Sequence, residues 1–148
     1  MTTVDGSKPR NMTVYKGETV YEGTVLAISG STVISAATSG AQVVGIADVA
    51  LVDQEGTART SRDGELIGVH ILGSGHIVRV KSTAVTYTIG EGVYAGNTSG
   101  YSMDNGAAGV SSYRIGTSLE AVTASAGDLV TVILDSPINT CKGVTPTN

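Results

Sequence analysis

The sequence predicts an all-β protein, and three observations support this class. Apolar and polar residues alternate in short runs separated by glycine-containing turns, which is the pattern of strands and hairpins. No segment of ten or more residues shows a convincing 3.6-residue period, and 20 glycines among 148 residues disfavour long helices. Charged residues make up only 15% and Phe and Trp are absent, so we expect an aliphatic core. The length suits one domain.

The first part of the chain contains three predicted strand regions. A strand-like alternation begins at Met12 and breaks at Gly17. Residues 24–29 and 32–36 are predicted to form a hairpin, because a Gly-Ser pair between them suits a type II′ turn. Residues 42–52 form a nearly continuous apolar run, which predicts one or two buried strands.

The middle of the chain is predicted to form a polar loop followed by a second hairpin. Residues 53–64 are the most polar segment and indicate a loop or an exposed hairpin. Residues 65–72 and 76–81 show period-2 alternation on either side of the turn Gly73-Ser74-Gly75. A glycine-rich turn between two alternating segments favours a hairpin.

The last part of the chain contains further predicted strands. We expect a strand pair near residues 85–89 and 92–95, and a turn at Asn105-Gly106. Residues 113–119 and 129–134 are predicted to be the final strands, and the second of these places alternate apolar residues on one face.

The chain contains an internal repeat. Residues 17–23 (GETVYEG) and 90–96 (GEGVYAG) share the pattern G-E-x-V-Y-x-G, and each copy precedes a strand with an internal glycine, Gly45 or Gly116. Each half then ends in an acidic turn before an apolar strand, Gly64-Glu65 and Gly127-Asp128. This predicts two related β units packed into one domain. We interpret the repeated element as a sharp turn; a ligand site used twice is the alternative.

The charge pattern excludes several partners. The net charge is −4 and the nine Lys and Arg residues are scattered, so binding to nucleic acid or to an anionic membrane is disfavoured. The sequence shows no signal peptide and no apolar run of membrane-spanning length. The single Cys141 cannot form an intrachain disulfide.

No catalytic, cofactor-binding or metal-binding residue is predicted. His70 and His76 flank the glycine turn as diagonal neighbours of the expected hairpin, but zinc needs three or four ligands and no Cys, Asp or Glu is obviously in reach. We therefore expect both to be solvent-facing strand residues. Arg59, Arg62 and Asp63 are candidates for an inter-subunit salt bridge, with a solvated loop as the alternative. The six Tyr residues favour core-edge and interface packing over a sugar-stacking face.

The order of these segments resembles the capsid cement, or head decoration, proteins of tailed bacteriophages. The resemblance covers about residues 14–135. It is carried by the first G-E-x-V-Y-x-G element and then by the segments 44–47 (VGIA), 89–95 (IGEGVYA), 115–121 (IGTSLEA) and 130–134 (VTVIL). These segments are structural rather than catalytic.

The resemblance implies a fold and a role. The fold is a compact bent-ribbon barrel of the β-clip or β-tulip kind, formed here by residues 12–135 between a flexible arm (1–11) and a polar tail (136–148). The role is that of a homotrimer on the outer surface of the virion, which binds the major capsid protein and stabilises the shell against internal DNA pressure. Neither a cofactor nor a nucleic-acid or membrane partner is implied.

The arm supplies a mechanism for capsid binding, because an extended segment can add a strand to an exposed sheet edge. The expected capsid-binding residues are Thr2, Thr3, Val4, Asp5, Gly6, Ser7, Lys8, Pro9, Arg10 and Asn11. One alternative is a carbohydrate-binding or host-surface-binding β module of a virion. A small β-clip hydrolase is less favoured, because its acidic metal-binding and Ser/Arg phosphate motifs are not found.

Overall fold

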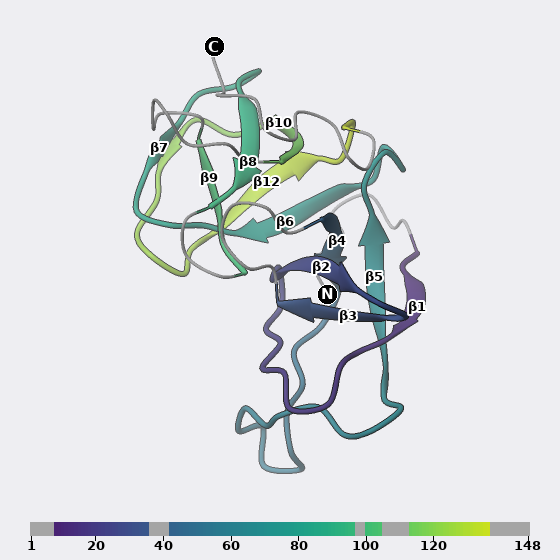
Figure 1. Ribbon diagram of the computed structural model, residues 1–148. Coiled ribbons are helices and arrows are strands. Elements are labelled where there is room, and N and C mark those ends of the chain that lie inside the picture. The colour runs from purple at the N-terminus through teal and green to yellow at the C-terminus, as the bar shows by residue number, and fades with distance from the viewer. Residues whose placement is uncertain (1–7, 36–41, 97–99, 105–112, 137–148) are drawn as a thin grey trace.

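The computed structural model describes residues 8–35, 42–96, 100–104 and 113–136, and all regular elements among them are strands (Figure 1). This confirms the all-β class. The strands are β1 (Arg10–Thr13), β2 (Val25–Ser29), β3 (Thr32–Ser35), β4 (Val43–Ala47), β5 (Leu66–Ile71), β6 (Ile77–Lys81), β7 (Thr86–Tyr87), β8 (Gly92–Ala95), β9 (Ser102–Asp104), β10 (Arg114–Ser118), β11 (Val122–Thr123) and β12 (Leu129–Ile133).

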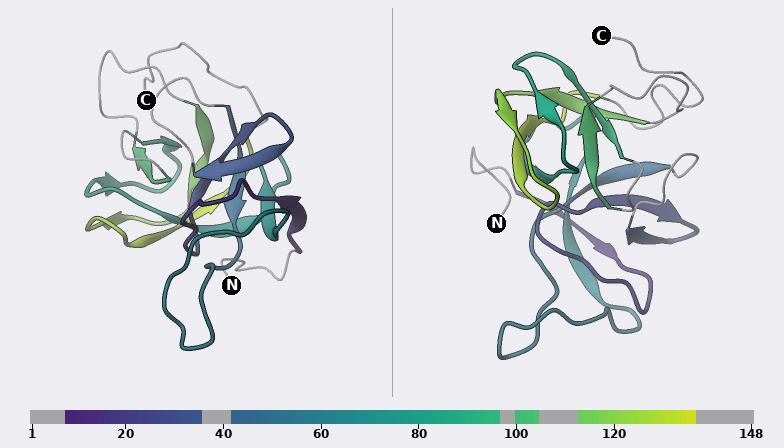
Figure 2. Two further views of the ribbon diagram at one scale, coloured as in Figure 1. Left: turned by 60° about the horizontal axis from the view of Figure 1, so that its bottom comes forward. Right: turned by 90° about the vertical axis from the view of Figure 1, so that its left-hand side faces the viewer.

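Ten of these strands form two five-stranded sheets with the same topology, and β7 and β11 form a separate two-stranded sheet. The first sheet has the order β1-β5-β4-β2-β3, and the second has the order β6-β12-β10-β8-β9. When the five strands of each sheet are counted in chain order, the first strand lies at one edge and is followed across the sheet by the fifth, fourth, second and third, in both sheets. We call these sheets the first unit and the second unit; Figure 2 shows them from two further directions. The common topology confirms the two related β units predicted from the repeat.

Each unit brings its first strand back to its third. Val14, directly after β1, forms a parallel bridge with Val33 of β3, and Ser82, directly after β6, forms a parallel bridge with Ser102 of β9. The backbone N–H of the next residue strengthens each bridge: Tyr15 donates to Val33 O at 2.9 Å, and Thr83 donates to Ser102 O at 3.0 Å. The sheets are therefore curled in the same way, while the β-clip or β-tulip description stays a prediction.

The glycines inside β4 and β10 stand where two strands approach closely. A Cβ on Gly45 would clash with the carbonyl oxygen of His70, and a Cβ on Gly116 would clash with that of Ile133. His70 and Ile133 occupy the same position relative to the acidic turns of their units. The sequence repeat therefore preserves a backbone approach that only glycine permits.

The repeated acidic turns also have one structure. Gly64 and Gly127 have positive φ angles of 73° and 92°, which glycine adopts without strain. The carboxylates of Glu65 and Asp128 each accept a hydrogen bond of 2.8 Å from the backbone N–H three residues earlier. These turns direct the chain into β5 and β12.

All of β4 and the first three residues of β2 are buried on both faces, because these strands belong to two cores. One core lies inside the first unit, and the other joins the first unit to the second. Side chains that enter the first-unit core are Leu26, Val44 and Ala47. Those that enter the shared core are Val25, Ala27, Val43 and Ile46. This explains why β4 lies in an almost continuous apolar run rather than an alternating one.

The hairpin expected from residues 65–72 and 76–81 is not formed. β5 lies in the first sheet and β6 in the second, so the chain crosses between units at Gly73-Ser74-Gly75. Both edges of β5 are already occupied, by β1 and β4, and none remains for β6. β6 pairs with β12 instead.

Two other expectations also differ from the structure. β7 and β8 do not pair, because β8 is bonded to β9 and β10 on its two edges and β7 pairs with β11. The first strand begins at Arg10, so two residues expected in the arm are part of β1. The Asn105-Gly106 turn, residues 1–7 of the arm and residues 137–148 of the tail lie outside the described residues.

The close approach at Gly116 predicts a large effect of one methyl group. Gly116→Ala should destabilise the protein by roughly 1–3 kcal/mol, because β10 and β12 must separate to admit a Cβ. Urea denaturation monitored by circular dichroism would measure this. The control is Ala121→Ser, at an exposed site, which should stay within about 0.5 kcal/mol of the parent. Equal stability of the two variants would contradict the assigned packing.

Candidate functional site

The candidate binding surface lies on the outer side of the ladder between β1 and β5. Alternate residues of β1 point into the first-unit core, so Asn11, Thr13 and Tyr15 lie on the opposite side. Thr13 is paired with Leu66 of β5. Tyr15 is 55% exposed and Leu66 is 59% exposed, and the register makes them diagonal neighbours. We call these four residues the outer face; none of them carries a charge.

The expected capsid-binding arm joins this surface directly. Thr2, Thr3, Val4, Asp5, Gly6 and Ser7 lie outside the described residues. Lys8 is exposed, and Pro9 packs against Gly68 so closely that a Cβ there would meet its ring. Arg10 and Asn11 are paired with β5, and the other edge of β1 is bridged to β3 at its C-terminal end, by Val14 and Val33. The part of this edge that precedes the bridge lies where the arm joins β1.

The polar loop is a small hairpin that extends from the first unit, away from the second (Figures 1 and 2). Val52 and Ala58 form an antiparallel bridge at its base. The Arg59 guanidinium binds both carboxylate oxygens of Glu65, and it also donates to two backbone carbonyls of the loop. Arg59 thus ion-pairs within its own chain. Arg62 and Asp63 are exposed, and an inter-subunit pair remains a prediction for them.

The Arg59–Glu65 pair sets the acid–base behaviour of the loop. The Arg59 side chain, with the backbone N–H of Arg62, lowers the pKa of Glu65 from 4.5 to about 2. The same hydrogen bond raises the pKa of Arg59. The ionised pair therefore fastens the loop to the start of β5, next to the outer face.

The two histidines are neighbours, although the expected hairpin is absent. The Nδ1 atoms of His70 and His76 lie 3.0 Å apart, and His70 Nε2 lies 2.9 Å from Asp48 Oδ1. His70 is completely buried, so the expectation of a solvent-facing residue was wrong. Sequence reasoning missed Asp48 as a partner because it is 22 residues away in the chain and reaches His70 only through the pairing of β4 with β5.

The hydrogen bonds assign protons along this chain of groups. The Asp48 carboxylate accepts a hydrogen bond from His70 Nε2–H, and in this tautomer of His70 Nδ1 is an acceptor. His76 Nδ1–H is then the donor to His70. If both rings were imidazolium, two N–H groups would face each other at 3.0 Å. The arrangement holds at most one imidazolium without loss of the Nδ1–Nδ1 hydrogen bond, and it ties β4 and β5 to the start of β6.

A crevice at the seam between the units contains two tyrosines and a lysine. Lys81 Nζ lies 3.9 Å from the ring centroid of Tyr21 and 4.7 Å from that of Tyr101. Two backbone hydrogen bonds between the units hold this arrangement, from Lys81 N–H to Gly23 O at 2.9 Å and from Val25 N–H to Gly100 O at 2.8 Å. The sequence places these tyrosines in different elements, and only the tertiary structure brings them together. We call this the Tyr–Lys crevice.

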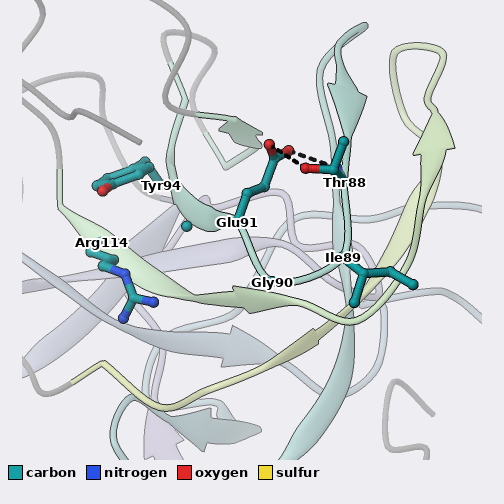
Figure 3. Close-up of a pocket in the computed structure, with 7 residues that line it drawn as sticks. Thr88, Ile89, Gly90, Glu91, Tyr94 and Arg114 are labelled. Atoms are coloured by element: carbon teal, nitrogen blue, oxygen red, sulfur yellow. Dashed lines mark hydrogen bonds between the residues drawn. The ribbon is translucent and has the colours of Figure 1, made fainter.

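A second groove lies at the other copy of the repeat (Figure 3) and has a volume of about 460 Å³. Its ionised groups are engaged within the chain: the Glu91 carboxylate accepts from the backbone and the hydroxyl of Thr88 at 3.0 Å, and Arg114 donates to Thr117 and Asp135. Tyr94 of this copy is buried, whereas the equivalent Tyr21 is 42% exposed. The two copies are therefore not one site used twice.

The remaining candidate groups serve local structure. Of the acidic residues in the C-terminal strands, Asp128 caps its turn, Glu120 accepts from Thr131 N–H, and Asp135 binds Arg114. Within the described ranges, no group of three or more His, Cys, Asp or Glu side chains is placed to hold a metal ion. The same ranges contain no helix with the length and apolar character needed to cross a membrane.

No protein-family model matches this chain, and no curated protein matches it either. Among solved structures, the N base of the head fiber gp8.5 of bacteriophage phi29 is similar, with a TM-score of 0.45 and 16% sequence identity. The match covers 86% of this chain and 96% of that chain. A likeness at this TM-score and identity is too weak to support a functional inference.

The pKa of Glu65 predicts an acid-dependent loss of stability. Because folding lowers this pKa from 4.5 to about 2, the contribution of Glu65 is complete above pH 4.5 and is lost as the pH falls towards 2. Glu65→Gln should be less stable at neutral pH and should lose less stability across that window. Thermal unfolding at several pH values would measure this. Glu55→Gln, at an exposed loop position, is the control; a parental pH profile for Glu65→Gln would contradict the assignment.

The histidine chain predicts one tautomer for His70. At neutral pH, ¹⁵N-resolved imidazole spectra should show His70 with its proton on Nε2 and a hydrogen bond at Nδ1. In Asp48→Asn the amide can donate to Nε2, so the Nδ1–H tautomer should become populated. An Nδ1–H tautomer of His70 in the parent protein would refute the proposed order of donors.

Proposed function

We propose that this chain is a virion structural protein that binds the outer surface of an icosahedral phage capsid as a homotrimer and stabilises the shell against internal DNA pressure. The resemblance of residues 14–135 to capsid cement proteins supports this role. The observation that carries it is the outer face: an uncharged surface with two exposed apolar side chains, Tyr15 and Leu66, next to the part of the β1 edge that precedes the Val14–Val33 bridge.

The outer face suits contact with another protein. Burial of an exposed Leu-sized side chain contributes roughly 1.5–3 kcal/mol, and the absence of charge removes most of the desolvation cost. The arm leads directly into β1, so a strand from the major capsid protein could pair with β1 before the Val14–Val33 bridge, or the arm itself could add to a sheet of that protein.

Modest contacts are sufficient because the partner surface is repeated. When three copies bind neighbouring capsid subunits, each contact after the first forms at a high effective concentration. The shared core makes the two units one packed body, so a load on the outer face is carried into the second unit. This is the property that a clamp between capsid subunits requires.

Binding to undecorated mature shells tests this role. The parent protein should bind saturably and raise the rupture temperature of the shells. The double variant Tyr15→Ser/Leu66→Ser should bind at least about tenfold more weakly, which corresponds to about 1.4 kcal/mol. Deletion of residues 1–7, which leaves β1 complete, should also weaken binding.

The matched control is Ile89→Ser/Leu119→Ser, which removes two exposed apolar residues from the second unit. It should bind with parental affinity. Failure of the parent protein to bind or stabilise shells would end the proposal, and an equal loss in both double variants would remove the outer face from it.

A further inference from the structure

The Tyr–Lys crevice holds a cation, Lys81, whose contacts among the described residues are with tyrosine rings rather than with an anion. Lys81 is only partly exposed, and its ammonium group lies against the faces of Tyr21 and Tyr101. No carboxylate among the described residues pairs with it. Two ring faces hold the ammonium in one place but leave it available to an anion from outside.

The other walls of the crevice are hydroxylated. Thr19, Thr24 and Ser35 line it together with Gly100, and the volume is about 230 Å³. Thr24 Oγ1 accepts from Tyr21 N–H and Ser35 Oγ donates to Thr19 O, so each hydroxyl is oriented and keeps capacity for a further hydrogen bond. The volume is below the roughly 300–1,000 Å³ of sites for drug-sized ligands, which favours one ring-sized group.

We propose that the Tyr–Lys crevice binds the anionic monosaccharide unit of an acidic glycan. The carboxylate of such a sugar pairs with Lys81, its hydroxyls meet the Thr and Ser side chains, and its C–H face packs on an exposed tyrosine ring. A single ammonium suits one carboxylate. A phosphate group would favour an Arg fork, and no Arg is among the described residues that line this crevice.

The location makes the site independent of the outer face. The crevice lies at the seam between the units, where β6 of the second unit meets the turn before β2. Binding at the crevice can therefore be measured on the free chain without capsids, and its outcome does not decide the capsid-binding proposal.

Ligand-observed NMR on the full chain tests the proposal with galacturonic acid, N-acetylneuraminic acid, galactose and acetate as probes. At least one acidic sugar should bind saturably at millimolar concentration, and galactose and acetate should bind at least about tenfold more weakly. Lys81→Met should lose that preference for the acidic sugar. Tyr21→Leu, at an exposed turn position, should weaken binding and serves as the second variant if Lys81→Met does not fold.

The matched control is Arg79→Met, which removes an exposed cation two residues earlier on the same strand and should leave binding unchanged. No saturable binding of either acidic sugar would overturn the proposal. Acetate bound as tightly as the acidic sugars would show carboxylate capture alone, as from an acidic peptide, and would also overturn it. An equal loss in Arg79→Met would reveal a general charge effect and reject the crevice as the site.

Discussion

All of β4 and the first three residues of β2 are buried on both faces, and the rest of the molecule is arranged around this constraint. The side chains of these residues fill two different cores, so neither side of this part of the sheet faces water. The first unit can enclose only one of these faces. The second unit must cover the other, and the backbone bonds from Lys81 to Gly23 and from Val25 to Gly100 lock that cover in place. Two similar sheets thereby become one packed body.

The two units share a topology but differ in the chemistry of the residues that close each sheet. Both are curled by a bridge between the first and third strands, yet the bridge is apolar in the first unit (Val14 and Val33) and polar in the second. There the Tyr87 hydroxyl lies 2.8 Å from Ser82 Oγ and 3.2 Å from Ser102 Oγ, and burial raises the Tyr87 pKa. The apolar closure leaves the first unit with a simple internal core and an uncharged outer face. The polar closure satisfies buried hydroxyls that would otherwise destabilise the second unit.

The outer face and the Tyr–Lys crevice also lie in different parts of the molecule. The outer face belongs to the first unit alone, and the loop fastened by Arg59 and Glu65 borders it. The Tyr–Lys crevice needs residues of both units and exists only because they are docked. The proposed protein-binding surface therefore lies on one unit, and the proposed small-ligand crevice lies at the seam between both.

The sequence by itself determined the all-β class, most strand positions and the duplication, because alternation, glycine turns and repeated motifs are local signals. The glycines at 45 and 116 were visible as a repeat before their backbone contacts were known. The tertiary structure alone decided which strands pair: a good turn at Gly73-Ser74-Gly75 failed to form a hairpin because β1 and β4 already occupied both edges of β5. It also decided that His70 meets Asp48 and that Tyr21 and Tyr101 enclose Lys81. These contacts join residues that are far apart in the chain. They depend on which strands pair, and strand pairing is set by competition for strand edges, which a local sequence pattern does not reveal.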